Sequence, residues 1–215
     1  MAKQPIAACR LYGFIDTAYL AGRNPAEVTR QLIAGGVDLI QVRAKKLSRS
    51  KLTALARVVV RAAQDTPVPV IVNDDLTAAS ESGADGVHLG QEDWAGIPQE
   101  ERLPKLLGLE ILGLSTHSFP QAMSAERDGA SYLGVGPVFA TGTKPGRAPV
   151  GVELLHQVAQ RVPTPFFAIG GITLDNLDEV LAAGATRIAV VSAILTAPDA
   201  ARAAAEFKKR LSATS

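Results

Sequence analysis

The chain has 215 residues, 47% hydrophobic and 20% charged, and its net charge of +1 reflects 22 Lys and Arg against 21 Asp and Glu. This balance provides no general attraction to nucleic acid or to an anionic membrane, so any anion must bind at a local site. No apolar run reaches the ~20 residues that cross a bilayer, and the N-terminal residues lack the apolar region of a signal peptide. The single cysteine, Cys9, excludes an internal disulfide and is typical of a reducing compartment. We therefore expect a cytoplasmic protein that acts on small molecules.

Eight short apolar runs predict buried strands. Four of them lie at 11–16, 68–74, 111–116 and 165–171. Between them a unit repeats, in which a helix-like stretch leads through a glycine into a β-branched run, at 31–44, 78–90, 124–136 and 180–193. A glycine after a helix is the usual left-handed C-terminal stop. An apolar run without alternation is typical of a strand buried on both faces.

Helical periodicity fills the segments between these runs, at 24–35, 48–64, 149–161 and 174–183. Eight strands that alternate with helices within roughly 200–250 residues predict an α/β protein with a single (β/α)8 TIM-barrel domain over residues 1–215. The alternative is an open doubly wound sheet, which rarely needs eight strands at this length.

Polar residues follow nearly every predicted strand. Catalytic residues of a (β/α)8 barrel lie at the C-terminal ends of its strands, so this distribution indicates a functional site. The residues, in chain order, are Asp16; Gln41, Arg43 and Lys45; Asn73 and Asp74; Asp93; Ser115, Thr116 and His117; segment 138–146; Gly170 and Gly171; and Ser192.

The residues Gln41, Arg43 and Lys45 alternate, so a strand would put all three side chains on one face. Taken singly, the two cations are as often solvated loop residues. Asp74 has the alternative role of capping a helix that starts near residue 76, and Asp93 that of a loop aspartate. Two carboxylates at neighbouring strand ends, opposite cations, suit Mg²⁺, which is typically held by one or two carboxylates together with substrate phosphates and water.

The segment VFATGTKPG (138–146) has the composition of a phosphate-binding loop but not the spacing of a P-loop, because Lys144 follows Thr143 and precedes a proline. The glycines of AIGGIT (168–173) and the segment Val191–Ser192 follow strands seven and eight, where barrels commonly bind phosphate through backbone N–H groups. For Ser192, a packed hydroxyl is the alternative.

The residues thus predict two anion sites at one barrel mouth. One combines cations with Mg²⁺ and fits a diphosphate, and the other is lined by backbone and fits a monophosphate. His88 is interpreted as a hydrogen-bonded core or mouth residue, His117 as a mouth or helix-entry residue, and His156 as a surface residue. Without an obvious general base or serine nucleophile, this combination favours displacement of a diphosphate by a phosphorylated acceptor.

Seven segments together resemble the thiamine-phosphate synthases and occur in that family's order between about residues 11 and 195. They are QVRAK (41–45), VNDD (72–75), ADGVHLGQED (84–93), GLSTHS (113–118), GVGPVFATGTK (134–144), AIGGI (168–172) and AVVSAI (189–194). The resemblance implies a (β/α)8 barrel that joins hydroxymethylpyrimidine diphosphate to a thiazole monophosphate. It also implies a dissociative reaction with Mg²⁺ as cofactor, in which pyrophosphate leaves first.

The same resemblance implies a role for each matching residue. The Mg²⁺ ligands would be Asp74 and Asp93. The diphosphate contacts, which are also the catalytic residues, would be Arg43, Lys45, Ser115 and Lys144. Gln41 and Asn73 match groups near the pyrimidine and its diphosphate. The thiazole phosphate would be received by Thr141, Thr143, Gly171, Val191 and Ser192.

Two alternatives to this function stay open. A related thiazole tautomerase uses the same barrel for isomerisation but generally lacks the Thr-x-Thr-Lys loop, and a non-catalytic barrel would bind thiamine precursors as a sensor. The expected partners are small-molecule substrates, with no nucleic acid and no membrane, and a homodimer is an open option.

Overall fold

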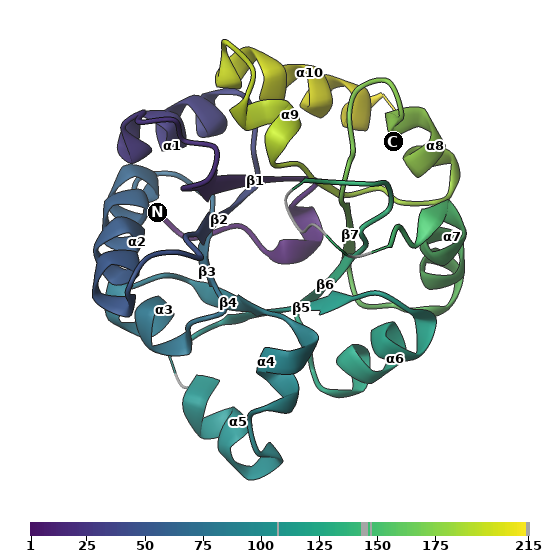
Figure 1. The fold of residues 1–215 in the computed structure, drawn as a ribbon, viewed down its shortest axis with the longest axis horizontal. Helices are drawn as coiled ribbons and strands as arrows, with labels where there is room; N and C mark the ends of the chain where they lie inside the picture. Colours follow the sequence, from purple (N-terminus) through teal and green to yellow (C-terminus); the bar gives the residue numbers. More distant parts are fainter. Residues whose placement is uncertain (107, 143–145, 147, 214–215) are drawn as a thin grey trace.

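The computed structural model describes residues 1–106, 108–142, 146 and 148–213. Its eight strands are all parallel and close into a barrel in sequence order, as Figure 1 shows in a view down the ring. They are β1 (Leu11–Asp16), β2 (Leu39–Arg43), β3 (Val70–Asn73), β4 (Gly86–Leu89), β5 (Ile111–Thr116), β6 (Tyr132–Val135), β7 (Phe166–Ile169) and β8 (Ile188–Ala189). The pairing of Leu11 with Ile188 joins the first strand to the last. The predicted TIM barrel is therefore confirmed, and the open sheet is excluded.

Helices form the outer ring of the barrel (Figure 1). They are α1 (Pro25–Ala34), α2 (Arg49–Ala63), α3 (Leu76–Ser82), α4 (Gln91–Ala95), α5 (Gln99–Leu106), α6 (Phe119–Arg127), α7 (Gly151–Arg161), α8 (Leu177–Ala182), α9 (Ser192–Leu195) and α10 (Ala200–Ser212), with a short 3₁₀ helix, η1 (Ile6–Ala8), before β1. The four segments predicted as helices correspond to α1, α2, α7 and α8. None of the described helices is long and apolar enough to span a membrane.

The repeated glycine signal is confirmed. Each of the four units contains one glycine with a positive φ angle at or just after its helix end, namely Gly36, Gly83, Gly129 and Gly184. A side chain at these positions would strain the backbone, whereas glycine adopts the left-handed conformation without a Cβ clash. Each glycine therefore turns the chain from an outer helix into the next inner strand.

Helix α10 was not among the predicted segments, although its sequence carries a helical signal. Its buried residues Ala200, Ala204, Phe207 and Leu211 recur at helical spacing. The Nζ atom of Lys208 lies 2.6 Å from Asp38 Oδ1, and Asp38 Oδ2 accepts the backbone N–H groups of Arg10 and Leu11, each at 2.9 Å. The last helix is thus tied to the N-terminal end of the first strand.

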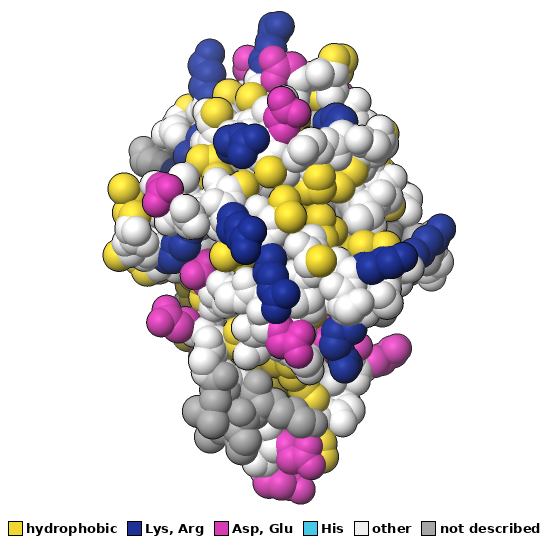
Figure 2. All heavy atoms as spheres, turned by 90° about the vertical axis from the view of Figure 1, so that its left-hand side faces the viewer, with side chains coloured by type: hydrophobic (Ala, Val, Ile, Leu, Met, Phe, Trp, Pro, Cys, Tyr) yellow, Lys and Arg dark blue, Asp and Glu magenta, His cyan; other side chains and the backbone are white. Residues whose placement is uncertain are grey.

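The face covered by α1, α2 and α3 has a mixed surface. Figure 2 shows Lys and Arg side chains interspersed with Asp and Glu, and small hydrophobic areas between them. Val58 of α2, which is 41% exposed, is one of the larger exposed apolar side chains of the described residues.

Candidate active site

Aromatic rings from β1, β6 and β7 pack together inside the barrel, and the two from β1, Tyr12 and Phe14, line a cavity there. The rings of Tyr12 and Phe14 stack with 4.8 Å between centroids, and Tyr12 meets Tyr132 and Phe167 edge to face at 5.8 and 5.2 Å. Because side chains alternate along a strand, residues 12, 14 and 16 of β1 all point inward. Of these three residues only Asp16 was predicted to lie at the site, although the alternation of side chains along the strand places Tyr12 and Phe14 on the same face.

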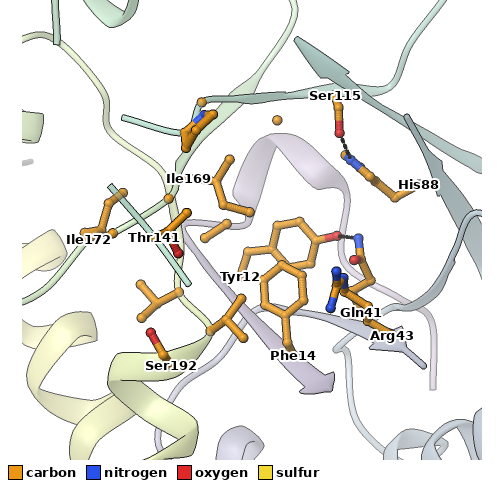
Figure 3. Close-up of a pocket in the computed structure, with 18 of the residues that line it drawn as sticks. Tyr12, Phe14, Gln41, Arg43, His88, Ser115, Thr141, Ile169, Ile172 and Ser192 are labelled. Carbon is orange, nitrogen blue, oxygen red and sulfur yellow. Dashed lines mark hydrogen bonds between the residues drawn. The ribbon is translucent and has the colours of Figure 1, made fainter. Parts of the chain in front are cut away.

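Eight of the eleven predicted substrate-binding residues line this cavity: Gln41, Arg43, Asn73, Ser115, Thr141, Gly171, Val191 and Ser192. Figure 3 shows Thr141 and Ser192 on one side of the stacked Tyr12 and Phe14 rings, and Gln41 and Arg43 on the other. The cavity therefore has two polar ends with an aromatic surface between them. Of the other three predicted residues, Thr143 and Lys144 lie outside the described residues.

The eleventh residue, Lys45, lies in the turn after β2, which ends at Arg43. The predicted alternation holds within the strand, since Gln41 and Arg43 both line the cavity. Lys45 instead contacts the carboxylate of Asp74.

Arg43 Nη1 donates to Asp16 Oδ2 at 2.7 Å, and both side chains are largely buried. The pair fixes the direction of the guanidinium at the barrel mouth.

The two predicted magnesium ligands, Asp74 and Asp93, lie beside each other, and their side chains are within hydrogen-bonding reach. Burial and the negative charge of Asp74 raise the pKa of Asp93 above its ordinary value. Two neighbouring carboxylates suit a hard cation that prefers oxygen ligands. No group of three or more His, Cys, Asp or Glu that could hold a metal occurs among the described residues. A cation on this pair would therefore need water or substrate oxygens as further ligands.

The turn after β3 separates the roles of two adjacent residues. Asp74 has a φ angle of +64°, and the N–H of Asp75 bonds to the carbonyl of Asn73 at 3.0 Å, so the chain reverses within three residues. A positive φ is uncommon for a residue with a side chain and often marks a functional position. Asn73 consequently lines the first cavity, whereas Asp74 and Asp93 line a second one.

The structure decides both alternatives for the carboxylates. Asp75, not Asp74, caps helix α3, because its side chain accepts from the N–H of Ala78 at 2.9 Å. Asp93 is not a loop residue but lies in the first turn of α4, where its Oδ2 accepts from the N–H of Gly90 at 3.1 Å. Asp74 is thus available for a role other than helix capping.

Trp94, the next residue of α4, packs away from the cavity. Its Nε1 donates to Asp128 Oδ2 at 2.7 Å, at the end of α6, and the guanidinium of Arg102 lies 4.2 Å from the centre of its ring. This contact anchors α4, and with it Asp93, to the outer ring of helices.

The histidines occupy the three environments that were predicted. His88 is buried, with Nδ1 2.9 Å from the hydroxyl of Tyr132 and Nε2 2.9 Å from Ser115 Oγ. His117 lies just before α6, lines the cavity, and donates from Nδ1 to the carbonyl of Gly136. His156 is exposed on α7.

The start of segment 138–146 is bonded to the loop after β7. Val138 and Phe139 donate their N–H groups to the carbonyls of Ile169 and Gly170, at 2.9 and 3.0 Å. A Cβ on Gly171 would lie 2.6 Å from the carbonyl oxygen of Ala140, so only glycine allows this approach. The two loops therefore form one wall of the cavity, in which Thr141 and Gly171 take part.

Comparison with known proteins agrees with this geometry. The model of one protein family, described as thiamine monophosphate synthase, matches residues 11–194. The chain belongs to this family. The thiamine-phosphate synthase activity predicted from the sequence, a transferase activity, is thereby confirmed.

Similar proteins cover nearly the whole chain. A thiamine-phosphate synthase from Thermus thermophilus is 45% identical over 184 residues, which are 85% of this chain and 87% of the relative. One from Chloroflexus aurantiacus is 40% identical over 206 residues, 95% of this chain and 94% of the relative. The solved structure of a thiamine phosphate pyrophosphorylase from Pyrococcus furiosus has a TM-score of 0.84 at 32% identity, and covers 96% of both chains. A 3-hexulose-6-phosphate synthase, at 20% identity and a TM-score of 0.67, shares the fold.

Proposed function

We propose that the chain transfers the pyrimidine-methyl group of hydroxymethylpyrimidine diphosphate to the nitrogen of hydroxyethylthiazole phosphate, with release of pyrophosphate. One observation carries this proposal: a single cavity has two polar ends separated by the aromatic rings of Tyr12 and Phe14, and two carboxylates, Asp74 next to Asn73 in the chain and Asp93, line a second cavity. Two phosphorylated substrates would each put an anionic group at one end, with their rings meeting between them.

The diphosphate would bind at the end formed by Arg43 and Ser115, next to Lys45. Arg43 is held in place by Asp16, so its remaining N–H groups are oriented before the substrate arrives. From the sequence, Lys144 would join this end. Asp74 and Asp93 would hold Mg²⁺, which when bound would supply positive charge to the departing diphosphate.

The thiazole phosphate would bind at the opposite end, near Thr141, Gly171, Val191 and Ser192. Hydroxyl groups and a backbone without a side chain allow close approach to phosphate oxygens. Gln41 and Asn73, both buried and both at the cavity, would contact the pyrimidine side of the first substrate.

The reaction would be dissociative. The bond between the methylene carbon and the diphosphate oxygen breaks first, and its electron pair leaves with pyrophosphate. The thiazole nitrogen then donates its lone pair to the pyrimidine-methyl cation. This sequence needs no general base, so the protein's contribution is positioning and stabilisation of the leaving charge.

The test is to incubate the pure protein with both precursors and Mg²⁺ and to measure pyrophosphate and thiamine phosphate. Pyrophosphate release that depends on the thiazole phosphate is the expected result. Thiazole isomerisation without pyrophosphate would instead favour the tautomerase, and binding of precursors without any product would favour the sensor. The homodimer and the cytoplasmic location stay predictions, and sedimentation of the pure protein tests the first of them.

A further inference from the structure

A chain of hydrogen bonds crosses the barrel between two predicted substrate contacts, Gln41 and Ser115. Gln41 Nε2 donates to the hydroxyl of Tyr12, whose oxygen lies 3.0 Å from that of Tyr132. The Tyr132 hydroxyl lies 2.9 Å from His88 Nδ1, and His88 Nε2 lies 2.9 Å from Ser115 Oγ. Figure 3 shows both ends of the chain at the cavity. The five residues come from β2, β1, β6, β4 and β5 in that order.

The interior of the barrel leaves room for this series of hydrogen bonds and keeps it buried. All five residues are buried, and Tyr132 at its centre is 0% exposed. A Cβ on Gly113 would lie 2.2 Å from Tyr132 Cζ and 2.6 Å from His88 Nδ1, so glycine at this position of β5 leaves room for their contact. Burial also raises the pKa of both tyrosines well above the ordinary value, so their hydroxyls stay protonated.

With a neutral imidazole at His88, this chain of hydrogen bonds has two consistent directions. A neutral imidazole has one donor nitrogen and one acceptor nitrogen, and each hydroxyl donates a single proton. If one hydroxyl turns round, every other bond in the chain must turn with it, because a buried donor without an acceptor is unfavourable. The orientation of the Gln41 amide is therefore coupled to that of the Ser115 hydroxyl.

A diphosphate at Ser115 selects one of these directions. Its oxygens accept hydrogen bonds and do not donate, so Ser115 must donate to them and accept from His88 Nε2. His88 Nδ1 then accepts from Tyr132, Tyr132 accepts from Tyr12, and Tyr12 accepts from the amide nitrogen of Gln41. This is the direction of the Gln41 bond in the structure. The carbonyl oxygen of Gln41 is then left as a hydrogen-bond acceptor for the pyrimidine.

We propose that Tyr12, Tyr132 and His88 are positioning residues that set the Gln41 amide according to the group bound at Ser115. With diphosphate bound, the site selects a pyrimidine that carries a hydrogen-bond donor, such as the exocyclic amino group of the thiamine pyrimidine, over one with an oxo group in its place. The inference rests on the proposed function, because it needs the diphosphate at Ser115 and the pyrimidine at Gln41.

The first test compares kcat/KM for the amino substrate with kcat/KM for its oxo analogue. Tyr132→Phe and Tyr12→Phe each remove one hydroxyl and keep the ring, so each breaks the chain. We expect each to lower the preference for the amino substrate by ~10-fold, a small part of what a hydrogen-bonding pocket can achieve. The double variant should lower this preference no more than either single variant, because the second substitution acts on a series of hydrogen bonds that the first has already interrupted. Independent effects that multiply, or an unchanged preference, would overturn the inference.

Thr116→Val is the matched control. Thr116 is buried on β5 beside Ser115, and its hydroxyl bonds to the carbonyl of Gly134 rather than to the chain. The variant removes a buried hydroxyl of the same strand, so the preference should stay at the wild-type value. A loss equal to that of the tyrosine variants would mean that any change in the core relaxes specificity, which would overturn the inference.

A second measurement is made on the wild-type protein, and a variant serves only to assign the signals. The ¹⁵N shifts of His88, identified by their loss in His88→Gln, should report a proton on Nε2 when pyrophosphate and Mg²⁺ are bound. A proton on Nδ1 in that state would overturn the proposed direction. Failure of the wild type to release pyrophosphate would count against the proposed function instead, so the two failures are distinguishable.

Discussion

Asp16 and Arg43 form an ion pair across the carboxyl ends of β1 and β2, with 2.7 Å between Oδ2 and Nη1, and their side chains are 1% and 11% exposed. The other carboxylate oxygen of Asp16 accepts from the N–H of Ala18 at 3.0 Å. Asp16 therefore fixes both the end of its own strand and the direction of the guanidinium that we assign to the diphosphate.

Removing the carboxylate should destabilise the protein. Asp16→Asn removes a buried negative charge that is paired with the guanidinium of Arg43, so the free energy of unfolding should fall by ~3 kcal/mol. Urea unfolding followed by circular dichroism measures this change. Asp178→Asn is the control, because Asp178 pairs with Arg210 while 77% exposed, and the effect there should be within ~0.5 kcal/mol. Equal effects of both substitutions would contradict the role of burial.

The proposed magnesium ligands can be distinguished from the other acidic groups nearby by substitution. Asp93→Asn and Asp74→Asn should each lower kcat and raise the Mg²⁺ concentration at half-maximal activity by ~10-fold or more, because a hard cation loses a charged ligand. Asparagine also tolerates the positive φ angle at position 74.

Asp75→Asn is the matched control for both variants. It removes a charge from the same cavity, yet asparagine still caps helix α3. Its Mg²⁺ dependence should equal that of the wild type. An unchanged Mg²⁺ titration in the variants at positions 74 and 93 would rule out the assignment.

The role of Lys144 is a prediction from the sequence. Lys144→Ala should lower kcat by ~10²-fold or more, as loss of a charge partner of the transition state typically does. Lys46→Ala, which removes one exposed lysine beside Lys45, should leave kcat unchanged. Steady-state kinetics separate an effect on kcat from one on KM. A change in KM alone would contradict the prediction, because it would mean that Lys144 binds the ground state and the transition state equally.

Cys9 gives the stability of the protein a pH dependence in the alkaline range. Burial raises the pKa of its thiol from 9.0 to about 12 in the folded chain. Above pH 9 the unfolded chain loses this proton while the folded chain keeps it, so the stability present at lower pH is lost as the pH rises. The loss between pH 9 and 10 should be at most ~1.4 kcal/mol. Urea unfolding at both pH values should show this slope in the wild type and a smaller one in Cys9→Ala; equal slopes would refute it.

The barrel could be predicted from the sequence because each of its strands and helices is indicated by a short stretch of neighbouring residues. The predicted strands 11–16 and 111–116 match β1 and β5 residue for residue. An apolar run, a glycine stop and a helical period each act over a few residues, so a single sequence reveals them. The short helices α4 and α9, with five and four residues, carry too little period to be recognised in this way.

The types of residue at the site could also be predicted, because strand ends of a parallel barrel meet at one mouth. Their individual neighbours could not. The left-handed turn at Asp74, the contact of Lys45 with that carboxylate, and the burial of Asp16 against Arg43 depend on backbone angles and on residues of another strand.

The sequence by itself therefore determined the order of strands and helices, the mouth at which polar groups gather, and the family. Only the tertiary structure decided which of those groups touch. The hydroxyls of Tyr12 and Tyr132 are 120 positions apart in the chain and 3.0 Å apart in space. Closure of the barrel brings them together, because β1 and β6 face each other across its interior, and no local pattern in the sequence records that contact.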